Sequence, residues 1–141
     1  MRCREIMKKD VECVLATDTA QAAAKRMRDV NVGFLPVCDQ SKRVLGTITD
    51  RDLTIRVLAD ASPSTTRMED VMTREVVCCR PDDDLEDAEN LMAKKQKSRI
   101  VVIDSGDALV GVISLSDIAQ REDGSKASQT LREVSQREAR Q

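Results

Sequence analysis

The feature that most constrains this chain is an internal repeat. Gly46–Asp52 (GTITDRD) and Gly111–Asp117 (GVISLSD) share the pattern Gly-x-Ile-[Ser/Thr]-x-x-Asp. The same offset of 65 residues (111 − 46) aligns the flanking sequence without a gap, for example Met7 with Met72. A repeat of this length predicts that the chain folds as two copies of one unit.

Size and composition limit what these copies can be. The chain has 141 residues, so each copy has about 60, a size at which a domain that folds alone is marginal. We therefore expect the copies to share a core. Since the chain has one Phe and neither Trp nor Tyr, that core must be aliphatic, and platforms for stacking nucleic-acid bases are missing.

Charge and hydropathy exclude several partners. The net charge is −2 and no basic patch stands out, which argues against a nucleic-acid partner. The N-terminus lacks the apolar core of a signal peptide, and the longest run of Val and Ile, Ile100–Ile103, is far too short for a membrane span. We expect a cytoplasmic protein with no membrane partner.

Each copy has the pattern of strand, helix, strand, strand, helix. In the first copy, Asp18 resembles a helix N-cap, Gly33 a helix stop, and Pro36 indicates an edge strand or a bulge. In the second copy Asp83 is the expected N-cap. The predicted strands are Val11–Leu15, Phe34–Cys38 and Arg43–Ile48, then Glu75–Cys79, Arg99–Ile103 and Leu109–Ile113.

The predicted boundaries follow from composition. Residues 1–59 form the first copy, 60–67 a polar linker, 68–122 the second copy and 123–141 a polar tail. Residues 127–140 are either a weakly amphipathic helix or a disordered tail, and we favour a frayed helix that orders against a partner.

The repeated motif has two compatible interpretations. Thr49 with Asp52, and Ser114 with Asp117, fit a helix N-cap followed by an acid at its third position. A helix N-terminus behind a strand that carries a Gly also suits an anionic ligand, and a carboxylate there can accept the two hydroxyls of a ribose.

These residues resemble a known family. The unit that ends in Gly-x-Ile-[Ser/Thr]-x-x-Asp is similar to a CBS domain, named after cystathionine β-synthase, and two in tandem resemble a Bateman module. The resemblance covers roughly residues 3–120, and the stretch from Lys97 to Ile118 is also similar to a repeat in the γ subunit of AMP-activated protein kinase. It implies an α+β fold, with two β-α-β-β-α units packed about a pseudo-two-fold axis.

The resemblance also implies a function. Such pairs commonly bind AMP, ADP, ATP, S-adenosylmethionine or NAD in the clefts between units, so we expect a non-catalytic sensor with an adenosine ligand. It implies a homodimer. Because the sequence shows no attached effector domain, we expect the signal to pass to an effector protein, and we expect no required cofactor. The residues that match the family's ligand contacts are Thr49, Arg51, Asp52, Arg99, Ser114, Ser116 and Asp117, with Thr17, Pro36 and Val37 near the adenine.

The two copies depart from each other in this pattern. The first has Gly33-Phe34 where the second has Ser98-Arg99, so the basic contact is missing there unless Arg51 supplies it. We therefore expect unequal clefts, with one good site rather than two.

The cysteines and the acidic triplet raise three further possibilities, which are a disulfide, a metal site and an enzyme. Cys13 and Cys38 lie in predicted strands that can be neighbours. In a reducing cytosol we expect two buried thiols there and not a disulfide. A disulfide with a redox response, or a ligand-free scaffold that dimerises, is the alternative function. Five Cys, no Cys-x-x-Cys and no His argue against a structural zinc site. The acidic triplet Asp82–Asp84 is more simply a helix cap than a metal site. Without a His, a Gly-rich phosphate loop or a nucleophile–base pair, an enzyme is not expected.

Overall fold

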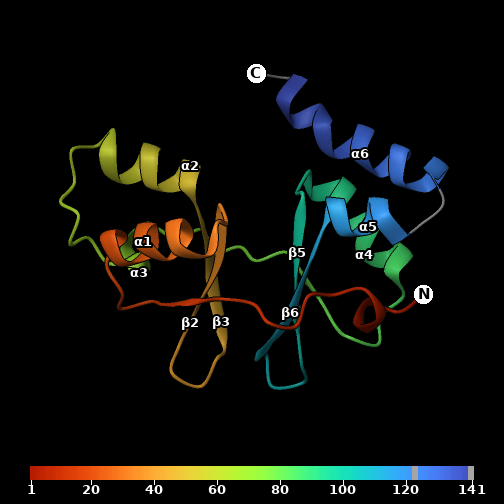
Figure 1. Ribbon diagram of the computed structural model, residues 1–141, viewed down its shortest axis with the longest axis horizontal. Coiled ribbons are helices and arrows are strands. Elements are labelled where there is room, and N and C mark those ends of the chain that lie inside the picture. Colours follow the sequence, from red (N-terminus) through yellow and green to blue (C-terminus); the bar gives the residue numbers. More distant parts are fainter. Residues whose placement is uncertain (122–123, 140–141) are drawn as a thin grey trace. The chain divides into compact units, whose positions relative to one another are not determined.

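A computed structural model describes residues 1–121 and 124–139 (Figure 1). It divides into two compact units, which are unit 1 (Met1–Val11 with Val77–Gln141) and unit 2 (Glu12–Val76). The predicted α+β class with two β-α-β-β-α units is confirmed, because each unit carries a three-stranded sheet with helices.

Unit 2 contains the first copy of the repeat. Its central strand β2 runs parallel to β1 and antiparallel to β3. A π-helical stretch, η2, continues α2. The elements are β1 (Val14–Leu15), α1 (Ala20–Val30), β2 (Phe34–Cys38), β3 (Val44–Thr49), α2 (Asp50–Leu53), η2 (Thr54–Leu58) and α3 (Met68–Val71).

Unit 1 repeats this topology with the second copy. Strand β5 lies between β4, which is parallel to it, and β6, which is antiparallel. The elements are η1 (Cys3–Glu5), β4 (Cys78–Cys79), α4 (Leu85–Lys95), β5 (Arg99–Ile103), β6 (Leu109–Ser114), α5 (Leu115–Arg121) and α6 (Gly124–Ala139).

The spatial units are offset from the sequence repeats. The N-terminal segment, residues 1–11, lies with the second copy, where Lys8 and Val112 exchange backbone hydrogen bonds of 3.0 and 3.1 Å. In the same way Thr73, which follows the predicted linker, exchanges two bonds of 2.9 Å with Thr47 in unit 2. Each motif strand therefore receives its neighbouring segment from the start of the other repeat.

The cores are aliphatic, as the composition requires. Met27 lies buried in the core of unit 2, and Met92 in that of unit 1. Ile48 and Ile113, the isoleucines of the two motifs, are fully buried in the respective cores. Each motif strand is thus fixed by burial of its own apolar residue.

The expected helix caps are each wrong by one residue. Thr19, and not Asp18, caps α1 by accepting a hydrogen bond from the Ala22 N–H. The Asp18 carboxylate instead accepts from the Leu15 N–H at 2.8 Å, which closes the turn before the helix. The second copy shows the same shift: Asp84 caps α4, while Asp83 accepts from the Arg80 N–H at 2.8 Å. Within the acidic triplet Asp84 therefore caps the helix and Asp83 closes the turn before it, while the Asp82 carboxylate pairs with Arg4.

The helix stop and the edge-strand assignment are also corrected. Helix α1 ends at Val30, because Asn31 adopts the left-handed conformation (φ 56°) two residues before Gly33. Pro36 lies in the central strand β2, so the edge-strand alternative is wrong, but the pairing of β2 with β3 does shift register, as at a β-bulge, between Val37 and Cys38. The proline is tolerated because β1 has only two residues, which pair with Val37 and Cys38. Val101 is its counterpart in unit 1, and its N–H donates to the Val77 carbonyl.

The polar tail contains the helix α6. It packs against α4 and α5 of its own chain, with Val134 buried, whereas we expected a helix that orders only against a partner. The part of the predicted helix at Arg140 lies outside the described residues. Within residues 1–121 and 124–139, no helix has both the length and the apolar character needed to cross a membrane.

Candidate functional site

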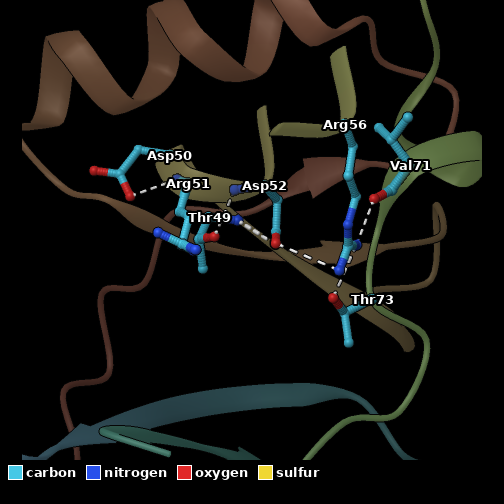
Figure 2. Close-up of polar contacts among 7 residues, drawn as sticks. All are labelled: Thr49, Asp50, Arg51, Asp52, Arg56, Val71 and Thr73. Atoms are coloured by element: carbon cyan, nitrogen blue, oxygen red, sulfur yellow. Dashed lines mark hydrogen bonds and ion pairs between the residues drawn. The ribbon is translucent and has the colours of Figure 1, made fainter. Parts of the chain in front are cut away.

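The first copy of the motif forms a reciprocal helix cap in unit 2 (Figure 2). The Thr49 hydroxyl accepts a hydrogen bond from the Asp52 N–H at 3.0 Å, and the Asp52 carboxylate accepts from the Thr49 N–H at 3.0 Å. The predicted capping role is therefore confirmed for this pair.

The second copy forms the same cap in unit 1. The Ser114 hydroxyl accepts from the Asp117 N–H at 3.2 Å, and the Asp117 carboxylate accepts from the Ser114 N–H at 2.9 Å. The Ser116 hydroxyl lies 2.9 Å from that of Ser114. Each aspartate thus uses one carboxylate oxygen for the cap and has a second oxygen that can contact another group.

In unit 2 that second oxygen faces an arginine. Asp52 Oδ1 lies 3.5 Å from Arg56 Nη2, and Arg56 Nη1 donates to the Val71 carbonyl at 2.8 Å and to the Thr73 hydroxyl at 3.0 Å (Figure 2). Sequence reasoning missed Arg56, although its position four residues after Asp52 on one helix is a recognisable signal.

In unit 1 the second oxygen faces a lysine of the N-terminal segment. Asp117 Oδ1 lies 3.6 Å from Lys8 Nζ, and the Lys8 side chain is 72% exposed. The sequence gives no signal for this pair, because Lys8 comes from the other repeat. The Asp117 and Asp52 side chains are 13% and 18% exposed, so solvent reaches both carboxylates.

Three of the predicted residues gather around one hollow in unit 1. Arg99, Ser114 and Ser116 line a space of about 530 Å³. The remaining lining residues are Ser98, Leu115, Ala119, Ser128 and Leu131. Ser128 and Leu131 belong to α6, and sequence reasoning did not foresee them because they lie outside the repeat. The hollow thus combines hydroxyls and a guanidinium, groups that can bind a phosphate or a sugar.

Unit 2 has a different hollow of about 430 Å³. Its lining residues include Arg56, which forms the ion pair with Asp52 of the motif. The other lining residues are Asp60, Ser62, Thr66, Asp70, Val71 and Met72. None of the predicted site residues of the first copy lines this particular hollow.

The other predicted residues lie in varied surroundings. Thr17 is exposed in the turn after β1, and Arg51 is exposed in the first turn of α2. Pro36 and Val37 are buried in β2, and Val37 belongs to the core of unit 2. Their part in holding an adenine stays a prediction.

All five cysteines are free thiols in the structure. Burial, and then the proximity of Cys13, raises the pKa of Cys38 to about 12, so these two thiols are neighbours. Cys3 and Cys79 also form a pair, with their sulfur atoms 3.7 Å apart. Sequence reasoning missed this second pair. Among the residues that the structure describes, no group of three or more His, Cys, Asp or Glu side chains is arranged so that it could hold a metal ion.

Comparison with known proteins assigns the family. The CBS domain model matches twice, at residues 3–59 and 68–124. The chain belongs to the CBS-domain family. The two matches correspond to the two copies of the repeat, so the chain carries a tandem CBS pair.

Relatives of the CBS pair extend over most of the chain. The CBS domain-containing protein YhcV of Bacillus subtilis is 37% identical over 116 residues, which are 82% of this chain and 81% of that protein. Hypoxic response protein 1 of Mycobacterium tuberculosis is 34% identical over 118 residues, 83% of this chain and 82% of that protein.

Solved structures agree on the fold. The crystal structure of hypoxic response protein I with two coordinated zinc ions superposes with a TM-score of 0.79 at 31% identity, covering 87% of this chain and all of that one. The CBS pair of protein MJ0100, in complex with 5′-methylthioadenosine and S-adenosylmethionine, gives a TM-score of 0.76 at 25% identity and covers 85% and 94% of the two chains.

Proposed function

We propose that this CBS pair is a non-catalytic sensor that binds an adenosine ligand, with the motif of unit 1 as its principal site. The observation that carries the proposal is the hollow that brings Arg99, Ser114 and Ser116 together beside the Asp117 cap. The MJ0100 pair, a structural relative, binds two adenosine compounds and supports the ligand class.

The chemistry assigns a role to each residue. The Asp117 carboxylate accepts the hydrogen bonds of two ribose hydroxyls, in exchange for its weak contact with exposed Lys8. The Ser114 and Ser116 hydroxyls and the Arg99 guanidinium, which has five donors, contact a phosphate. A volume of about 530 Å³ falls within the usual range for small-molecule sites.

The site of unit 2 is the weaker one in this proposal. Its Asp52 is held by Arg56, and Arg56 is itself fixed by two further hydrogen bonds. A ribose must therefore compete with a partly buried, well-anchored cation, and the structure places no residue like Arg99 at the start of β2, where Phe34 stands.

The ligand class is tested by thermal melts with AMP, ADP, ATP, 5′-methylthioadenosine, NAD and S-adenosylmethionine. At a hundredfold excess over Kd, a ligand that binds only the folded state adds about 2.7 kcal/mol. For a chain of this size that raises Tm by roughly 5–10 °C. No shift with any of these ligands would contradict the proposal and favour the ligand-free scaffold.

A matched pair of arginine variants sharpens the test. Arg99→Gln is expected to weaken AMP and ATP binding about tenfold or more and to leave 5′-methylthioadenosine, which has no phosphate, almost unchanged. Arg51→Gln, which removes an exposed cation next to the motif of the other copy, is expected to change the affinity for neither class of ligand. Equal losses for both classes of ligand in Arg99→Gln would show that Arg99 does not contact phosphate.

The ligand's effect must pass to another protein, because we propose no reaction for the pair itself. A ligand shifts a conformational equilibrium only through its different affinities for the two states. Helix α6 lines the hollow through Ser128 and Leu131 and so is the element of unit 1 best placed to respond. The cytoplasmic location and the effector protein both stay predictions.

We also propose a homodimer through the helical face of unit 2. Ile55 is 45% exposed and Leu58 is 76% exposed, three residues apart on η2. In the second copy of the repeat the sequence has Gln120 and Asp123 at these positions. Apolar residues in one copy and polar ones in the other point to a covered face on unit 2.

Light scattering coupled to size-exclusion chromatography tests this dimer. Wild type is expected to have twice the monomer mass, and Leu58→Glu to be monomeric, because a carboxylate in an apolar interface is desolvated without a partner. Leu131→Glu, at an exposed leucine on α6, is the matched control and should stay dimeric. A monomeric wild type, or a dimeric Leu58→Glu, would refute the interface.

A further inference from the structure

Two cysteines that have no part in the adenosine site lie side by side in unit 1. The Sγ atoms of Cys3, in η1, and of Cys79, in β4, are 3.7 Å apart. Cys3 is 0% exposed and Cys79 is 7% exposed. The two residues are 76 positions apart in the chain, so the fold and not the sequence brings them together.

Unit 2 shows what packing alone requires at these places. The repeat offset aligns Cys3 with Met68 and Cys79 with Val14. Both Met68 and Val14 are buried in the core of unit 2. Because apolar side chains fill the corresponding space in the other unit, two thiols are not needed to fill it in unit 1.

The backbone fixes Cys3 at this position. The Cys3 N–H donates to the Asp83 carbonyl and the Arg4 N–H donates to the Pro81 carbonyl, both at 2.9 Å. The Leu85 N–H donates to the Met1 carbonyl at 2.8 Å. A disulfide bond is about 2.05 Å long, so the two sulfur atoms need to approach by less than about 2 Å.

We propose that Cys3 and Cys79 are a redox-active dithiol, which forms an intramolecular disulfide by exchange with a low-molecular-weight disulfide and so fastens the N-terminal segment to unit 1. The proposal does not depend on the adenosine ligand.

The exchange takes place in two steps. The Cys3 thiolate attacks one sulfur of the small disulfide, forms a mixed disulfide and releases one small thiolate. The Cys79 thiol then loses its proton to that thiolate and attacks Cys3 Sγ. The second small thiolate leaves and takes up the proton that Cys3 released to solvent when it ionised. Two protein thiols are oxidised to one disulfide, and one small disulfide is reduced to two thiols.

The order of attack follows from the surroundings of the two sulfurs. The hydrogen bond with Cys79 lowers the pKa of Cys3, which favours its thiolate as the first nucleophile. The hydrogen bond with Cys3, burial, and the charge of Cys3 raise the pKa of Cys79. Once Cys3 is part of a mixed disulfide, two of these three causes are removed and Cys79 can ionise and attack. Cys3 lies in a 3-10 helix of only three residues, whose local opening gives the reagent access.

The bond would reach the candidate site through the N-terminal segment. This segment also carries Lys8, which pairs with Val112 of the motif strand and faces Asp117. A disulfide at Cys3 would therefore restrict the motion of the N-terminal segment, which includes Lys8, the cation that faces Asp117.

The test oxidises the native full-length protein with glutathione disulfide, alkylates the remaining thiols under denaturing conditions and cleaves after glutamate. We expect peptide 1–5 joined to peptide 76–86, with the loss of two hydrogens, in wild type and in Cys78→Ser. The oxidised protein should melt roughly 5–15 °C higher than the reduced one, because the bond closes a long loop.

The matched variants are Cys3→Met and Cys79→Val, which carry the residues of unit 2 at these places and should fold like the reduced wild type. Both are expected to lose the joined peptides and the rise in Tm. No joined peptides in wild type, or joined peptides that persist in Cys79→Val through Cys78, would overturn the proposal. Wild type and Cys78→Ser decide the question even where the other two variants fail to fold.

Discussion

The two motifs of this CBS pair have the same backbone cap but different cations. In unit 2, Asp52 is held by Arg56 of the same helical segment, and Arg56 has further bonds to Val71 and Thr73. In unit 1, Asp117 faces Lys8, which is mostly exposed and comes from the N-terminal segment. The repeat thus preserves the helix start, while residues around it decide how freely each carboxylate can accept a ligand.

Substitutions of the two motif glycines should have the largest effects on stability. A Cβ on Gly46 would lie 2.7 Å from the Thr73 carbonyl oxygen, and one on Gly111 would lie 2.9 Å from the Lys8 carbonyl oxygen. Since both contacts involve backbone, Gly46→Ala and Gly111→Ala should each destabilise the fold by about 1–3 kcal/mol. Urea unfolding measures this loss.

Gly106→Ala is the control for these glycines. Its Cβ would lie 3.5 Å from the nearest neighbouring atom, an ordinary contact, so we expect a change within about 0.5 kcal/mol. Amide hydrogen exchange gives a second readout. Residues 1–11, which lie with unit 1, should exchange faster than in wild type in Gly111→Ala but not in Gly46→Ala. Unchanged stability in both motif variants would mean that the segments do not pack on the strands as described.

A smaller effect separates the two cations. Arg56→Gln loses bonds to a carbonyl, a hydroxyl and a carboxylate and should cost about 1–2 kcal/mol. Lys8→Gln removes one contact of an exposed side chain and should cost less than about 0.5 kcal/mol. Thermal melts at low and high salt measure both; Lys25→Gln, on the exposed side of α1, serves as the baseline. Equal costs for Arg56 and Lys8 would contradict the difference that we draw between the motifs.

Much of the fold could be predicted because the repeat and the hydrophobic pattern agree. Strands β2 and β5 were predicted with their observed bounds, Phe34–Cys38 and Arg99–Ile103, since buried apolar runs flanked by turns are distinct in sequence. The N-caps were displaced by one residue. Adjacent polar residues such as Asp18 and Thr19 both satisfy the cap preference, and only the geometry of the preceding turn decides between them.

The candidate site was predictable where it lies within one repeat. The capping pairs and the position of Arg99 follow from local sequence, whereas Lys8 beside Asp117, Cys3 beside Cys79, and Ser128 in the hollow depend on segments distant in the chain. The alignment of the two copies pairs only equivalent positions. It carries no information on which segment packs against which strand.

The central claim is that unit 1 has the principal adenosine site, and calorimetric titration with AMP tests it most directly. Asp→Asn variants retain an oxygen that can accept the cap hydrogen bond, but lose the charge that favours two ribose hydroxyls. We predict one site per chain in wild type, an almost unchanged affinity in Asp52→Asn, and a loss of about tenfold or more in Asp117→Asn. Two equal sites, or a loss that follows Asp52 instead of Asp117, would contradict the account.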